Sequence, residues 1–97
     1  MKRRVVKIPN EAGLHMRAAS VFVQRAGSFT AEVLVSRGEL RVNGKSIMGL
    51  MMLAAPFGTE LAIEVDGPDE RTAADDLVRL VESGFGEGVW RNPKEAQ

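Results

Sequence analysis

The chain has 97 residues, 44% of them hydrophobic, and its 13 basic residues balance its 13 acidic ones, so it can build one modest core but lacks the broad basic field of most nucleic-acid binders. It has no cysteine, and no cluster of carboxylates is visible around its one histidine; disulfides and thiolate metal sites are excluded, and we expect no metal site and no nucleic-acid partner. No signal peptide and no apolar run of membrane-spanning length is recognisable, so we expect a cytoplasmic protein that does not insert into a membrane.

The first half of the chain predicts a strand, a helix and two more strands. Residues 4–9 predict a short strand, which a loop follows. From Met16 the apolar residues follow helical spacing, and Gly27 is a typical helix stop. Alternation over residues 29–35 predicts a second strand, and residues 40–42 begin the strand that returns after a turn.

The second half predicts a short helix over residues 47–54, a fourth strand and a longer helix. Alternation over residues 60–65 gives the strand. Pro68 suits the first position of the last helix, which we expect to end at Gly84 or Gly86. The expected order is therefore β-α-β-β-α-β-α.

Strands that alternate apolar and polar residues predict a sheet with helices on one face and water on the other. The fold class is therefore α+β, with two layers. We expect residues 1–87 to form a single domain and residues 88–97, polar apart from Val89 and Trp90, to be a flexible C-terminal tail.

His15, the only histidine, stands just before the first predicted helix, after Gly13 and close to Arg17. Backbone N–H groups at a helix start disfavour a positive imidazolium and can donate to an anion attached to the ring. The guanidinium of Arg17 suits phosphate oxygens. This pattern favours a phosphoryl acceptor, although most lone histidines in loops are surface residues without a chemical role, and that alternative stays open on these residues alone.

Ser46 ends the stretch NGKS, which resembles the end of a phosphate-binding P-loop. That motif needs a glycine at position 39, where this chain has Glu39, so nucleotide binding is excluded. Ser46 is more typical of a helix N-cap. A phosphate there would be locally tolerated and would add roughly −2 charge to the surrounding surface.

The helix that follows Ser46 is apolar on nearly every face. We expect Ile47, Leu50 and Ala54 to form a stripe toward the core. Three methionines, Met48, Met51 and Met52, lie partly off that stripe. They either fill the core or form an adaptable docking surface, and the sequence does not decide between the two.

The residues "GLHMRAAS", "NGKSIMGLMMLAA", "GTELAIEVDGPDE" and "ESGFGE" together resemble HPr, the histidine-containing phosphocarrier of the bacterial phosphoenolpyruvate-dependent sugar phosphotransferase system. The resemblance covers about residues 4–87, in order. It implies an open-faced sandwich in which three helices cover one face of a four-stranded antiparallel sheet. It also implies a monomeric carrier of phosphoryl groups, without a cofactor, rather than an independent enzyme.

The resemblance implies a role for each matching residue. His15 would take a phosphoryl group on Nδ1 from enzyme I and pass it to enzyme IIA proteins, and Arg17 would help to hold and release it. Ser46 matches the regulatory serine that an ATP-dependent HPr kinase/phosphorylase modifies, and a transcription regulator is a further possible partner. The family's docking surface would map to Met16, Ser20, Gln24, Ile47, Met48, Met51 and Met52.

This chain departs from the family pattern near the histidine. The family commonly reads H-A-R-P-A, where this chain has Met16 and Ala18, and a polar residue often stands where this chain has Ala12. The ring must then be held in another way, and N–H groups of Met16 and Arg17 near it would explain part of this. Two other functions stay open: a regulatory phosphocarrier of the nitrogen-related type, and a binding adaptor controlled through Ser46, although adaptors of this family typically lack the active histidine.

Overall fold

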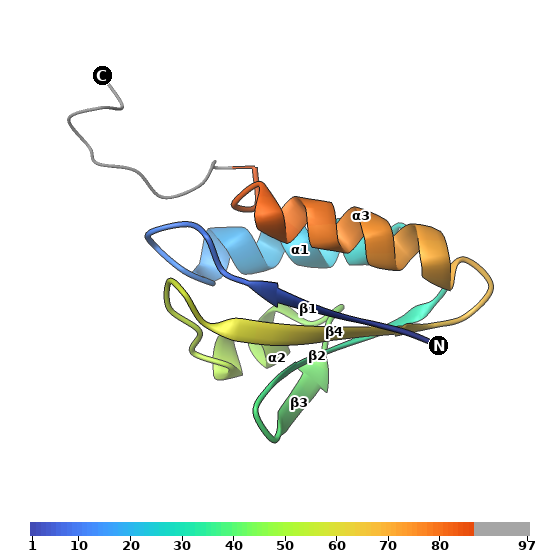
Figure 1. Cartoon of the computed structure of the whole chain (residues 1–97), viewed down its shortest axis with the longest axis horizontal. Coiled ribbons are helices and arrows are strands. Elements are labelled where there is room, and N and C mark those ends of the chain that lie inside the picture. The colour runs from blue at the N-terminus through green and yellow to red at the C-terminus, as the bar shows by residue number, and fades with distance from the viewer. Residues whose placement is uncertain (87–97) are drawn as a thin grey trace.

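The computed structural model describes residues 1–86 and has the predicted order of elements (Figure 1). Their bounds are β1 Lys2–Lys7, α1 Met16–Gly27, β2 Glu32–Arg37, β3 Leu40–Asn43, α2 Ile47–Met52, β4 Glu60–Asp66 and α3 Glu70–Glu82. The predicted tail, residues 88–97, lies outside the described residues. No helix among those residues is both long and apolar enough to cross a membrane.

The four strands form one sheet in the order β1-β4-β2-β3, and every pair is antiparallel. The register places Val33 beside Val65 and Val35 beside Ile63, so that these side chains share one face of the sheet. Helix α1 contributes Phe22, α2 contributes Leu50, and α3 contributes Leu77, Leu80 and Val81 to the same buried cluster. The fold class, an open-faced α+β sandwich, is confirmed.

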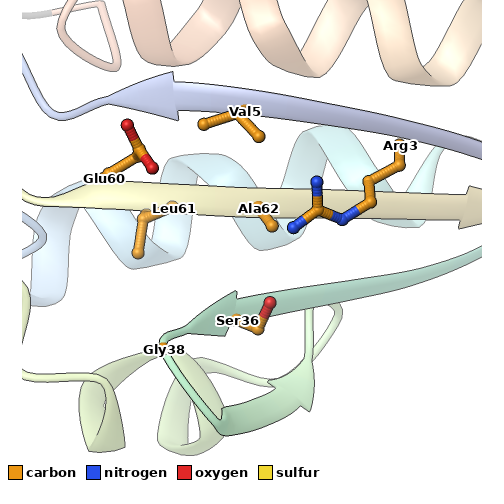
Figure 2. A pocket seen from close by; sticks show the side chains of 7 residues that line it. All are labelled: Arg3, Val5, Ser36, Gly38, Glu60, Leu61 and Ala62. Carbon is orange, nitrogen blue, oxygen red and sulfur yellow. The ribbon is translucent and has the colours of Figure 1, made fainter.

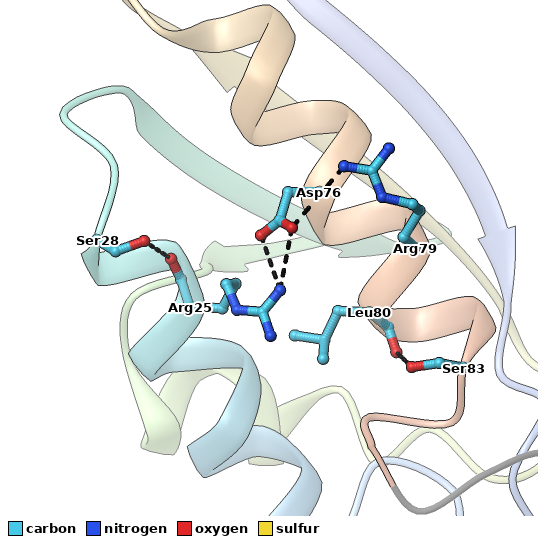
Figure 3. Close-up of polar contacts among 6 residues, drawn as sticks. All are labelled: Arg25, Ser28, Asp76, Arg79, Leu80 and Ser83. Atoms are coloured by element: carbon cyan, nitrogen blue, oxygen red, sulfur yellow. Dashed lines mark hydrogen bonds and ion pairs between the residues drawn. The ribbon is translucent and has the colours of Figure 1, made fainter.

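Helices α1 and α3 run side by side along one side of the sheet (Figure 1). An ion pair joins them: Arg25 Nη1 donates to both carboxylate oxygens of Asp76, at 3.0 Å each (Figure 3). Each helix also ends with a serine hydroxyl that donates to a backbone carbonyl, from Ser28 to Arg25 at 2.7 Å and from Ser83 to Leu80 at 2.8 Å (Figure 3). Both carbonyls lie in the last turn of their helix, and each also accepts a backbone N–H, from Ser28 and from Phe85.

The second strand begins later than predicted, at Glu32 instead of residue 29. The N–H groups of Thr30 and Ala31 donate to the carboxylate of Asp69, each at 2.8 Å, instead of to a neighbouring strand. The bond from the Thr30 N–H, followed by the bond from Ala31, holds the pKa of Asp69 below its ordinary value. Asp69 stands at the N-cap of α3, so this helix also begins two residues later than Pro68 suggested.

Helix α2 is shorter than predicted and presents a different face to the core. It ends at Met52, and Ala54 is exposed with a φ of +46°. Ile47 is 37% exposed, whereas Leu50 is 1% and Leu53 is 2% exposed. The predicted core stripe was therefore right for Leu50 and wrong for Ile47 and Ala54, because a helix of six residues can turn only one narrow face inward.

Candidate functional site

The loop before His15 is held in a single backbone conformation by three contacts. Asn10 Nδ2 donates to the Gly13 carbonyl at 2.8 Å, and the Gly13 N–H donates to the Asn10 carbonyl at 3.1 Å. The Leu14 N–H donates to the Ala55 carbonyl at 2.8 Å, which ties the loop to the segment after α2. Gly13 has a φ of +70°, and a Cβ there would lie 2.7 Å from the Ala55 oxygen and 2.9 Å from Pro56 Cα. Only glycine fits this position without a shift of the neighbouring backbone.

His15 is the N-cap of α1, with extended backbone angles (φ −81°, ψ 177°). Its Nδ1 accepts from the Arg17 N–H at 3.2 Å and lies 3.5 Å from the Ala18 N–H. The donors are therefore Arg17 and Ala18, where the sequence suggested Met16 and Arg17. Because Nδ1 accepts these bonds, it carries a lone pair, and the neutral ring holds its proton on Nε2. An imidazole in place of the usual hydroxyl or carboxylate thus caps the helix.

The structure brings Arg17 and Met16 to the same helix start as His15, and both side chains are exposed. Among residues 1–86 the Arg17 guanidinium has no hydrogen-bond or ion-pair partner, so it is available to an anion at this helix terminus. Ala12 is exposed too, its methyl group offers the ring no hydrogen bond, and the thioether of Met16 is at most a weak acceptor. The backbone of α1 takes over the bracing of the ring.

Ser46 is the N-cap of α2, as the sequence predicted, and its Oγ accepts from the Gly49 N–H at 3.1 Å. The preceding turn is fixed by Asn43, whose Oδ1 accepts from the Lys45 N–H at 2.9 Å. The Lys45 ammonium donates to the Phe29 carbonyl at 2.9 Å. Ser46 is half-buried, so its hydroxyl borders the solvent.

The seven residues predicted to dock partners lie on α1 and α2, two helices in contact with each other. Met48 is 81%, Met52 68%, Met16 66%, and Met51 and Ile47 each 37% exposed. Gln24 is exposed and Ser20 half-buried. The methionines therefore expose apolar side chains on both helices, and the alternative that they all fill the core was wrong. Phe57, 49% exposed in the loop after α2, was not anticipated, because that loop has no periodic pattern.

Two hollows lie on the open face of the sheet. One, of about 180 Å³, has small residues on its floor and Arg3 and Glu60 at its margins; it is lined by Arg3, Val5, Ser36, Gly38, Glu60, Leu61 and Ala62 (Figure 2). None of these residues belongs to the predicted site. Within residues 1–86 no group of three or more histidine, cysteine or acidic side chains is arranged to hold a metal ion.

Comparison with known proteins points to one family. The family model described as "PTS HPr component phosphorylation site" matches residues 2–83. The phosphocarrier protein HPr of Neisseria meningitidis serogroup A is 50% identical over 88 residues, which are 91% of this chain and 99% of that protein.

Solved structures agree with this result. The HPr of Thermoanaerobacter tengcongensis has a TM-score of 0.87 at 42% identity, covering 92% of this chain and 100% of that one. The catabolite repression protein Crh of Bacillus subtilis, whose structure is a domain-swapped dimer, has a TM-score of 0.71 at 37% identity, covering 94% and 100%. The expectation that this chain is a monomer stays a prediction.

Proposed function

Because this chain belongs to the HPr family of phosphocarrier proteins of the phosphotransferase system, we propose that His15 accepts a phosphoryl group from enzyme I and passes it to an enzyme IIA protein in sugar uptake. The observation that carries the proposal is the position of Nδ1 at the N-cap of α1, beside two backbone N–H groups. A nucleophile there has a lone pair on the correct atom and an anion-binding helix terminus next to it.

The transfer forms one bond and breaks one. The Nδ1 lone pair attacks phosphorus, the bond from phosphorus to the donor breaks, and its electron pair stays with the donor. Nδ1 cannot accept the Arg17 N–H and attack phosphorus with the same lone pair, so the ring must move back from the two N–H groups far enough for the phosphoryl group to lie between them and Nδ1. The N–H groups of Arg17 and Ala18 are then free to donate to phosphoryl oxygens. Passing the group to enzyme IIA reverses these steps.

Arg17 supplies the charge that the backbone donors lack. Its guanidinium has no partner among residues 1–86 and can approach the same oxygens. We expect Arg17→Gln to slow transfer by about a hundredfold to a thousandfold, the usual range for losing one group that stabilises transition-state charge. Arg25→Gln is the matched control, because Arg25 lies on the same helix but pairs with Asp76 at 3.0 Å on another side. Equal transfer rates in Arg17→Gln and Arg25→Gln would refute the role proposed for Arg17.

The exposed methionines of α1 and α2 are proposed to dock the partner enzymes. Their flexible thioether side chains suit a surface that must fit both a donor and an acceptor. Met48→Ala should therefore raise the KM of enzyme I for this chain and leave the kcat of phosphoryl transfer nearly unchanged. Val5→Ala, which removes a 50% exposed apolar group from the open face of the sheet, should change neither constant.

Ser46 is proposed as a regulatory phosphorylation site for an ATP-dependent HPr kinase/phosphorylase. A phosphate on Oγ would bring about two negative charges next to Met48 and Ile47, within the proposed docking surface. Incubation with kinase and ATP should label the wild type and leave Ser46→Ala unlabelled. Labelled protein should then accept phosphate from enzyme I more slowly, and an unchanged rate would refute the regulatory role.

The test of the carrier function is a reconstituted relay. Phosphoenolpyruvate, enzyme I and this chain should give a phosphorylated chain that passes its phosphate to a sugar-type enzyme IIA, and His15→Ala should accept none. Exchange with nitrogen-type enzymes alone would favour the regulatory phosphocarrier instead. A His15→Ala variant that still accepts phosphate would refute the assignment of the acceptor.

A further inference from the structure

The segment that follows α2 contains a residue in a backbone conformation that its side chain disfavours. Ala54 has a φ of +46°, in the left-handed region that costs an L-residue energy through its Cβ. Such a conformation persists only where the surroundings enforce it. The carbonyl of the next residue, Ala55, accepts the N–H of Leu14 at 2.8 Å, and Leu14 directly precedes His15.

Arg37, the last residue of β2, enforces this conformation. Its Nη1 donates to the Ala54 carbonyl at 2.7 Å and to the Leu53 carbonyl at 3.0 Å. Both carbonyls stand at the C-terminus of α2, where helix carbonyls have no partner within the helix. Hydrogen bonds from a charged donor are the stronger kind. One guanidinium therefore fixes both peptide groups on either side of the turn at Ala54.

The strained turn in turn shapes the loop that carries His15. Gly13 lies so close to Ala55 and Pro56 that a Cβ would have no room, and the Leu14 N–H is bonded to Ala55. The path of contacts runs from Arg37 through Ala54 and Ala55 to Leu14, and His15 follows directly. Any shift of Ala55 moves the backbone from which the His15 ring projects.

We propose that Arg37 is a positioning residue for His15, acting through the left-handed turn at Ala54 and the hydrogen bond from Leu14 to Ala55. Its effect on phosphoryl transfer rests on the function proposed above, whereas its effect on the ring does not. Arg37 itself touches neither the ring nor the group transferred.

The test compares Arg37→Gln with two other variants of the full chain. Arg41→Gln is the matched control, since Arg41 lies on β3 across the hairpin and its guanidinium bonds Glu64 at 2.8 Å on the open face. Arg37→Gln with Ala54→Gly is the rescue variant, because glycine adopts the left-handed conformation without strain. Urea unfolding identifies conditions in which every variant is folded.

The readouts are the hydrogen-exchange rate of the Leu14 amide and the ¹⁵N shifts of the His15 ring. In Arg37→Gln we expect exchange at Leu14 to be about tenfold faster, the effect of losing a charge-assisted clamp, and the ring signals to move. Arg41→Gln should change neither, and the rescue variant should return exchange to within about threefold of the wild type. The kcat for phosphoryl transfer should follow the ring signals while KM stays constant.

Two results would overturn the proposal. Leu14 exchange and ring shifts that respond no more to Arg37→Gln than to Arg41→Gln would show that the clamp does not reach His15. A slower transfer with unchanged ring signals would make Arg37 a partner contact instead. If the wild-type chain accepted no phosphate, the proposed function would fail, but the exchange and ring measurements would still decide the role of Arg37.

Discussion

Replacing Gly13 with alanine tests how tightly the loop before His15 is built. The added Cβ destabilises the folded state in two ways. Alanine at a φ of +70° costs about 1–2 kcal/mol of backbone strain. The Cβ would also lie 2.7 Å from the Ala55 oxygen, so Ala55 and Pro56 must move, which costs a further 1–3 kcal/mol or so. The expected loss in the free energy of unfolding is therefore about 2–5 kcal/mol.

Gly38→Ala separates these two costs. Gly38 also has a positive φ, +59°, but no atom lies within 4 Å of the added Cβ. This variant should lose only the strain, about 1–2 kcal/mol. Urea unfolding followed by far-ultraviolet circular dichroism measures both variants. Equal losses in Gly13→Ala and Gly38→Ala would refute the close packing of the loop against Ala55 and Pro56, and with it the reasoning on how His15 is positioned.

Three further predictions concern the rest of the fold. Leu50→Ala should lower the free energy of unfolding by about 2–5 kcal/mol, because Leu50 is 1% exposed, whereas Met48→Ala at 81% exposure should change it by less than about 0.5 kcal/mol; equal urea midpoints would refute the assigned faces of α2. Ser46→Ala removes the acceptor of the Gly49 N–H and should cost about 1 kcal/mol in the same assay, and no loss would contradict the cap. Asp69 has a lowered pKa, chiefly because its carboxylate accepts the Thr30 N–H. Its contribution to the free energy of unfolding should therefore be complete above its unfolded pKa and disappear as the pH falls below about 4 through its folded value. Asp69→Asn should flatten the acid limb of a plot of melting temperature against pH, and an unchanged limb would contradict the assignment.

Most of the topology could be predicted from the sequence, because the patterns that define helices and strands are local. Alternation over β4 and helical spacing over α1 and α3 are repeated several times within each element, so single exceptions do not hide them. Errors arose where a distant residue intervened. The alternation that begins at Phe29 is a strand pattern, yet Thr30 and Ala31 bond to Asp69, 39 and 38 residues away.

Part of the site could also be predicted, because it depends on local sequence patterns. His15 and Ser46 were placed correctly at helix N-termini, since capping depends on nearest neighbours in the chain. The short apolar helix α2 has too few residues to define a face, so Ile47 was assigned to the core although it is 37% exposed. The contacts from Arg37 to Ala54 and from Leu14 to Ala55 join segments far apart in the sequence, and no local pattern announces them.

The atom to which the phosphoryl group is attached decides whether His15 Nδ1 is the acceptor. The chain, phosphorylated with phosphoenolpyruvate and enzyme I and labelled with ¹⁵N in its one histidine, allows the bonded ring nitrogen to be identified by NMR from its coupling to phosphorus. We expect an acid-labile phosphate on His15 Nδ1, the atom that faces the Arg17 and Ala18 N–H groups in the unphosphorylated protein. A phosphate on Nε2, or on any residue other than His15, would contradict it.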